Sequence, residues 1–82
     1  SVVSKLPELE IRITKDKKVY LKSDSFALSE FADSFTMLKS KYPLKSIVYI
    51  KADEGLSYKD VMFVLKTVKQ AGFTNISLET NG

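Results

Sequence analysis

The sequence predicts a two-layer α/β sandwich, an α+β fold in which two helices cover one face of a mixed sheet in the order β-β-α-β-α-β. Three observations support this fold class. Apolar residues alternate with polar ones near the N-terminus, two later segments carry apolar residues at three- and four-residue spacing, and a short unbroken apolar run lies between those segments. The first pattern is typical of strands with one wet face, the second of amphipathic helices, and the third of a strand covered on both faces.

The N-terminal part of the sheet is predicted to be an antiparallel hairpin. Leu9, Ile11 and Ile13 alternate with polar residues, and the alternation resumes at Val19 and Leu21 after a charged stretch at residues 15–18. That stretch lacks the glycine of the commonest two-residue hairpin loops, but it is short enough to join two neighbouring strands. The polar residues 23–25 are expected to end the second strand.

The first helix is predicted from residue 28 to a point before Pro43, because the residue preceding a proline disfavours helical geometry. One face of this helix is apolar and is expected to pack on the sheet. The apolar stripe consists of Leu28, Phe31, Ala32, Phe35, Leu38 and Tyr42.

Residues 45–80 predict a strand, an acidic loop, a capped helix, a glycine stop and a closing strand. Ser57 can accept a hydrogen bond from the amide of Asp60, whose carboxylate can reach back to the Ser57 amide in a capping box. Gly72 suits a left-handed end of the helix, with Phe73 packing back on it. Ile76 and Leu78 then alternate with polar residues as the final strand. The apolar stripe of this second helix is predicted to be Tyr58, Val61, Met62, Leu65 and Val68.

Length and composition limit the possible functions. A chain of 82 residues has room for one domain, which buries only about 60–65% of its unfolded surface, so association with another chain would add stability. We expect residues 1–8 to be an N-terminal linker and residues 9–82 to be the domain. The formal net charge of +3 is a mild bias that does not by itself indicate nucleic acid. Without cysteine or histidine, the chain lacks thiolate metal ligands and the commonest general base.

The acidic pair at the end of the third predicted strand is the strongest candidate for chemistry. Asp53 and Glu54 could act as a carboxylate dyad or bind a cation, because ligands often bind beyond strand ends in α/β proteins. However, no second set of ligands or nucleophile with a base accompanies them, and an aspartate at a strand end usually stabilises its own turn. We therefore predict no catalytic residue, no metal site and no cofactor, and interpret Asp53, Ser57, Tyr58, Asp60 and Gly72 as structural.

Apolar residues that do not fit the buried stripes are candidates for contact with a partner. Phe63 and Met37 point roughly opposite the stripes of their helices on a wheel of about 100° per residue. In the third predicted strand, Val48 and Ile50 point to one face and Ile47 and Tyr49 to the other, so one of these two pairs must face away from the helices. The candidates for partner or dimer contacts are Met37, Val48, Ile50, Phe63 and Leu78, with Ile47 and Tyr49 as the alternative pair on the third strand.

Four lysines in and after the predicted hairpin turn are candidates for contact with an acidic partner: Lys15, Lys17, Lys18 and Lys22. A single-stranded RNA-binding α/β domain is the alternative interpretation of a basic sheet that carries Tyr20. Sheets that recognise RNA use aromatic residues on two central strands within a glycine-rich motif, and the sequence has no such motif. We therefore do not expect nucleic acid to be the partner.

Residues 45–80 also resemble the C-terminal signature of the ExbD/TolR family. In that signature a strand ends in a basic residue and Ala-Asp, and a short loop, a tyrosine, an apolar helix, Ala-Gly and a closing strand follow. The matching residues here are Lys51, Ala52, Asp53, Tyr58, Val61, Val64, Ala71, Gly72, Phe73 and Leu78. The order of the preceding hairpin and helix agrees as well, so the resemblance covers nearly all of residues 9–80.

The resemblance implies a non-enzymatic periplasmic domain of a single-pass bacterial inner-membrane protein, which couples proton motive force to transport or envelope maintenance. The partners that it implies are a second copy of the chain, an ExbB- or TolQ-like membrane protein and a TonB- or TolA-like protein. Peptidoglycan is a further implied partner, for which the four lysines are the candidates. Members of the family carry a membrane helix with a proton-binding aspartate; these 82 residues do not include such a segment, so that role is assigned to no residue here. The resemblance does not separate the ExbD branch from the TolR branch.

Overall fold

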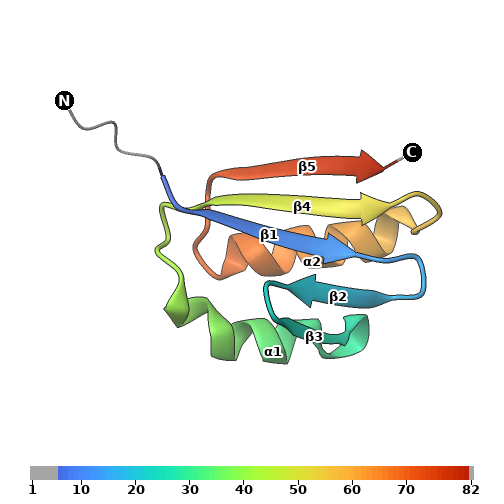
Figure 1. The fold of residues 1–82 in the computed structure, drawn as a ribbon, viewed down its shortest axis with the longest axis horizontal. Helices are drawn as coiled ribbons and strands as arrows, with labels where there is room; N and C mark the ends of the chain where they lie inside the picture. Colours follow the sequence, from blue (N-terminus) through green and yellow to red (C-terminus); the bar gives the residue numbers. More distant parts are fainter. Residues whose placement is uncertain (1–5, 82) are drawn as a thin grey trace.

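The computed structural model describes residues 6–81, whose arrangement is shown in Figure 1. The elements of this part of the chain are β1 (Glu8–Ile13), β2 (Lys18–Leu21), β3 (Asp24–Ala27), α1 (Phe31–Leu38), β4 (Ile47–Asp53), α2 (Tyr58–Gln70) and β5 (Ile76–Asn81). Short 3-10 turns at Leu28–Glu30 and Lys39–Lys41 flank α1. Most of the predicted linker, residues 1–8, lies outside the described residues.

The strands form one mixed sheet in the order β3-β2-β1-β4-β5. β1 is antiparallel to β2 and parallel to β4, while β4 is parallel to β5. Figure 1 shows α2 running behind the strands and α1 lying near β3. The predicted class, an α+β fold with a mixed sheet and two helices, is confirmed.

The structure adds a strand that the sequence pattern did not predict. Residues 24–27 pair antiparallel with β2 after a two-residue turn, although residues 23–25 were expected only to end the preceding strand. In that turn Lys22 has a φ of +55°, a conformation that residues other than glycine rarely adopt. Phe26 lies opposite the buried Val19 and is half-buried, which ties this polar strand to the core.

The face of β4 that packs on the helices is set by its register with β1. Leu9 lies beside Val48 in the parallel ladder, and both are fully buried. Ile50 is also fully buried, so the prediction that Val48 and Ile50 contact a partner is wrong. Because successive side chains of a strand point to opposite faces, the alternative pair, Ile47 and Tyr49, lies on the open face of the sheet, where both are half-buried.

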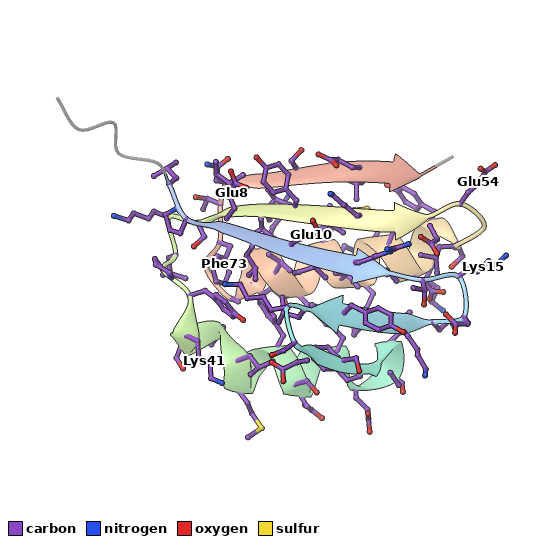
Figure 2. All side chains as sticks on the ribbon, in the orientation of Figure 1. Glu8, Glu10, Lys15, Lys41, Glu54 and Phe73 are labelled. Atoms are coloured by element: carbon purple, nitrogen blue, oxygen red, sulfur yellow. The ribbon has the colours of Figure 1, made fainter. Side chains whose placement is uncertain are left out.

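An aromatic cluster joins the two helices and the start of the last strand. The rings of Phe31 and Phe35 are stacked with their centroids 5.2 Å apart, and the centroid of Phe73 lies 5.7 Å from that of Phe35. All three side chains are buried, and Figure 2 shows Phe73 near the end of the sheet where β1 and β4 begin. Phe73 therefore packs back on the core, as predicted.

The buried stripe of α2 is narrower than predicted. Val61, Val64 and Val68 are its buried residues, whereas the side chain of Tyr58 is 78% exposed. On a wheel of about 100° per residue, Tyr58 lies roughly 90° from the centre of these three valines, which moves it out of the interface with the sheet. The assignment of Tyr58 to the core was therefore wrong.

Candidate functional site

The acidic loop after β4 is built around backbone and cross-strand contacts. The amide of Leu56 donates to the backbone carbonyl of Asp53 at 3.4 Å. The sequence suggested that the Asp53 carboxylate stabilises this turn. Instead, the carboxylate faces the Arg12 guanidinium on the neighbouring strand, with 3.8 Å between Oδ1 and Nη2. Glu54 is exposed and lies at the same end of the sheet as Lys15 (Figure 2). Residues 6–81 contain no group of three or more acidic, histidine or cysteine side chains placed to hold a metal ion.

The N-terminus of α2 carries half of the predicted capping box. The Ser57 hydroxyl accepts from the Asp60 amide at 3.2 Å, which satisfies one of the free donors of the first turn. The Asp60 carboxylate does not return to the Ser57 amide; it faces the ammonium group of Lys17 at 3.7 Å. This ion pair connects the β1–β2 turn to α2, a contact between distant residues that no local pattern predicts.

Gly72 provides the left-handed residue just beyond the C-terminus of α2, as predicted. Gly72 has a φ of +108°, and its amide donates to the Lys69 carbonyl at 3.0 Å. A Cβ atom at this position would lie 3.2 Å from a methyl group of Leu44. Glycine is therefore favoured here both by the backbone conformation and by the close approach of the Leu44 side chain in the α1–β4 connection.

Of the two outer strands of the described sheet, β5 is the longer. β5 has six residues, while β3, the opposite edge, has four and includes polar Asp24 and Ser25. Leu78 lies beside Ile50 in the register and so points to the helix side, but its side chain is 45% exposed because β5 lies at the margin of the layer. Within residues 6–81, the outer side of β5 has no partner strand and carries an exposed leucine.

The open face of the sheet contains a shallow depression of about 700 Å³. Its lining residues come from β1, β2, β4 and the adjoining turns: Glu8, Glu10, Arg12, Thr14, Tyr20, Lys22 and Tyr49. Figure 2 shows Glu8 and Glu10 along β1. Acidic and basic side chains both lie on this face, so it offers no continuous strip of positive charge for RNA among the described strands.

One ion pair on this face shifts a pKa. The Glu10 carboxylate accepts from the ammonium group of Lys51 at 3.0 Å, and this hydrogen bond raises the pKa of Lys51. The two residues come from neighbouring parallel strands. The pair was not predicted, because the register between β1 and β4 cannot be read from either strand alone.

The remaining candidate contacts lie on the helices. Met37 on α1 is 79% exposed, and Phe63 on α2 is 40% exposed, so both project from the core as predicted. Phe63 is not free of the core, since its ring meets the buried Phe31 edge-on with 6.5 Å between centroids. Their contact with a partner stays a prediction.

A sequence model of the family described as biopolymer transport protein ExbD/TolR matches residues 2–82. The chain belongs to the ExbD/TolR family. Two Helicobacter pylori proteins, from strains 26695 and J99, are named as ExbD-like biopolymer transport proteins, and each is 42% identical to this chain over 73 residues. These residues make up 89% of the chain and 55% of each relative, so the chain spans about half the length of the curated relatives that it matches.

Family membership confirms the resemblance carried by residues 45–80 and places the domain among ExbD/TolR transport proteins. Within residues 6–81, neither helix has the length and apolar character needed to cross a bilayer.

The four lysines singled out by their charge as candidates for contact with peptidoglycan or an acidic partner do not form one cluster of free charges. Lys17 pairs with Asp60, while the ammonium group of Lys22 lies 5.2 Å from the centre of the Tyr42 ring. Lys15 and Lys18 are exposed in and beside the turn between β1 and β2. Contact of this group with peptidoglycan stays a prediction.

Proposed function

We propose that this ExbD/TolR chain is a non-catalytic periplasmic domain that passes the effect of proton motive force to a TonB- or TolA-like protein. It would act in an inner-membrane complex with an ExbB- or TolQ-like partner. Membership in a family of biopolymer transport proteins supports this role. The acidic loop is consistent with a part that does no chemistry, because the carboxylate of Asp53 faces Arg12 and not a second acid.

The observation that carries the proposal is the open edge of β5. The amide of Val48 donates to the Asn75 carbonyl at 2.8 Å. In a parallel ladder, successive residues of a strand point their backbone amides alternately to one side and the other. The bond to the Asn75 carbonyl therefore means that the amides of Ser77 and Glu79 point toward β4, while those of Ile76 and Leu78 point away from the sheet. Among residues 6–81, the edge thus presents donors and acceptors without a partner strand, together with an exposed leucine.

Such an edge is suited to association. A long unprotected edge strand readily pairs with a strand of another chain, and two copies of the same edge can pair around a two-fold axis. The domain is also small, so burying this edge would add to its limited stability. We infer that β5 forms a homodimer, or alternatively receives a strand of the TonB- or TolA-like partner by the same hydrogen bonding.

The proposal can be tested in cells that lack the chromosomal gene and express the full-length protein carrying this domain. Leu78→Lys places a charge on the β5 edge, and Ser25→Lys places the same charge on the β3 edge. If the protein serves transport, we expect Leu78→Lys to abolish energised uptake, which is the uptake that a protonophore abolishes. If the protein serves envelope maintenance, we expect Leu78→Lys to raise the sensitivity of the cells to detergent. Ser25→Lys should behave as wild type.

Comparison of the two readouts assigns the branch of the family. Loss of energised uptake alone indicates an ExbD-type role, and detergent sensitivity alone indicates a TolR-type role. The proposal is wrong if Leu78→Lys, present at the wild-type level, supports both functions fully. It is equally wrong if deletion of the whole domain leaves both functions intact.

A further inference from the structure

A second surface, separate from β5, lies along the exposed side of α2. Two adjoining hollows of about 440 and 430 Å³ share Lys59 and Phe63 in their linings. One extends toward the β3–α1 connection and the other runs over the outer side of α2. We call the combined surface the α2 groove and define it by Leu28, Tyr58, Lys59, Met62, Phe63 and Lys66. No residue of β5 lines it.

Phe63 lies at the junction of the two hollows. One edge of its ring is held against Phe31, which is itself fully buried and stacked on Phe35. Phe63 is 40% exposed, so part of its side chain is accessible to a partner. An aromatic side chain that is fixed by the core in this way loses little conformational entropy on binding, which is the property of an anchor residue at protein interfaces.

Other apolar side chains extend the groove on both sides of Phe63. Leu28 is buried beneath one hollow, while Tyr58 and Met62, one helical turn apart on α2, border the other. Tyrosine and methionine are common at interfaces, the first because its ring is amphipathic and the second because its side chain adapts to a partner's shape. Packing of α2 on the sheet does not explain these residues, since Val61, Val64 and Val68 form the buried stripe.

The charges around the groove indicate the chemistry of its partner. Lys59 and Lys66 have no carboxylate within 4.0 Å among residues 6–81. Asp60, the acid in the lining, is already paired with Lys17. The N-terminal end of the α2 dipole, at Tyr58, adds positive potential to the same region. The groove is therefore apolar along its centre and positive along its rim.

We propose that the α2 groove binds an amphipathic protein segment that presents an apolar side chain to Phe63 and acidic side chains to Lys59 and Lys66. A second copy using the same surface would bring these lysines close to their own symmetry mates and repel. A bilayer surface is flat, whereas the accessible part of Phe63 lies between two hollows that a side chain can enter. The proposal does not depend on association through β5, because the two surfaces share no residue.

The test uses defined probes and nuclear magnetic resonance titration of this chain. The probes are a helical peptide with a leucine and phenylalanine face flanked by glutamates, its counterpart with lysines in place of the glutamates, and phosphatidylglycerol vesicles. We expect the acidic peptide to shift the amide signals of α2 around Phe63, with an affinity that falls as salt is added. The lysine peptide and the vesicles should leave these signals unchanged.

Matched variants locate the contact. Phe63→Ser should weaken binding of the acidic peptide by at least about tenfold, whereas Met37→Ser, an equally polar change on α1, should not. Because Phe63→Ser also removes a contact with Phe31, the double variant Lys59→Glu/Lys66→Glu provides a test that leaves the core intact. It should lower affinity for the acidic peptide by at least about tenfold and create affinity for the lysine peptide, unlike Lys41→Glu/Lys45→Glu.

The proposal is overturned if both peptides bind equally well, if the shifts map to β5 or the open face, or if charge reversal at Lys59 and Lys66 has no effect. Absence of binding by the acidic peptide also overturns it. Binding of the vesicles with loss on Phe63→Ser would assign the groove to a membrane surface and would equally overturn it. None of these outcomes depends on the cell assay with Leu78→Lys, so failure of either proposal can be recognised separately.

Discussion

Replacing Gly72 by alanine should destabilise the domain more than the same change at Gly55. Both glycines have positive φ, +108° and +101°, which cost an L-residue about 1–2 kcal/mol, partly offset by about 0.4–1 kcal/mol from the less flexible unfolded chain. Their surroundings differ. A Cβ at Gly72 lies 3.2 and 3.3 Å from the Leu44 methyl groups, whereas a Cβ at Gly55 has no atom within 4 Å.

The contact with Leu44 sets the size of the difference. Leu44 is 55% exposed, so its side chain can move aside, at a cost of about 0.5–1 kcal/mol for an unfavourable rotamer and lost packing. We therefore expect Gly55→Ala to cost about 1 kcal/mol and Gly72→Ala about 1.5–2 kcal/mol, the latter a fall in Tm of roughly 6–16 °C for a domain of this size. Urea unfolding followed by circular dichroism measures both free energies.

A double-mutant cycle isolates the contact. In the Leu44→Ala background the Cβ at position 72 meets no leucine methyl groups, so the two glycine substitutions should destabilise the protein equally. The account of the α2 terminus is refuted if Gly55→Ala is the more harmful change in the wild-type background. It is also refuted if the excess cost of Gly72→Ala persists when Leu44 is absent.

Ile50→Ala should lower the free energy of unfolding by about 2–5 kcal/mol and Tyr49→Ala by under about 1 kcal/mol, measured by urea unfolding; equal losses would contradict the assigned face of β4. Ser57→Ala should cost about 1 kcal/mol through loss of the cap, and an unchanged unfolding midpoint would show that the bond to the Asp60 amide contributes nothing. The raised pKa of Lys51 means that stability from its pair with Glu10 is present below the ordinary value of 10.5 and is lost as pH rises through the folded-state pKa. Glu10→Gln should therefore lose less stability than wild type as pH rises above 10.5, and parallel losses would contradict this.

The elements that follow local rules could be predicted from the sequence. Alternation of Leu9, Ile11 and Ile13 indicated β1 because a strand with one wet face has a period of two. The spacing of Phe31 and Phe35 indicated α1 because residues four apart share a helix face. The limits of α2 were equally local, since its N-terminal cap and C-terminal glycine act within one turn of the helix.

The misassigned features depend on distant parts of the chain. β3 is polar and begins at a turn in which a lysine adopts positive φ, so neither its pattern nor its turn signalled a strand. β4 is apolar on both faces at residues 47–50, and only its register beside β1 decides that Val48 and Ile50 are buried. Tyr58 was misassigned because a broad apolar stripe does not show where its centre lies.

The interaction surfaces were predicted only in part. Phe63 could be singled out because it lies opposite the buried stripe of its helix, whereas the exposure of Leu78 follows from the place of β5 at the margin of the sheet, which the period of the strand does not show. The α2 groove could not be singled out, since it is completed by Leu28 from the β3–α1 connection. Similarly, the pair of Lys17 with Asp60 joins a turn to a helix that follows far along the chain. Neither element carries a local signal of this contact.

Sedimentation equilibrium of this chain tests most directly whether the β5 edge is the surface through which it associates. We predict a concentration-dependent dimer for the wild type and for Ser25→Lys, and a monomer for Leu78→Lys, whose charge lies on the exposed strand. A wild-type chain that stays monomeric at every accessible concentration would contradict the account. So would a dimer that survives Leu78→Lys but is lost in Ser25→Lys.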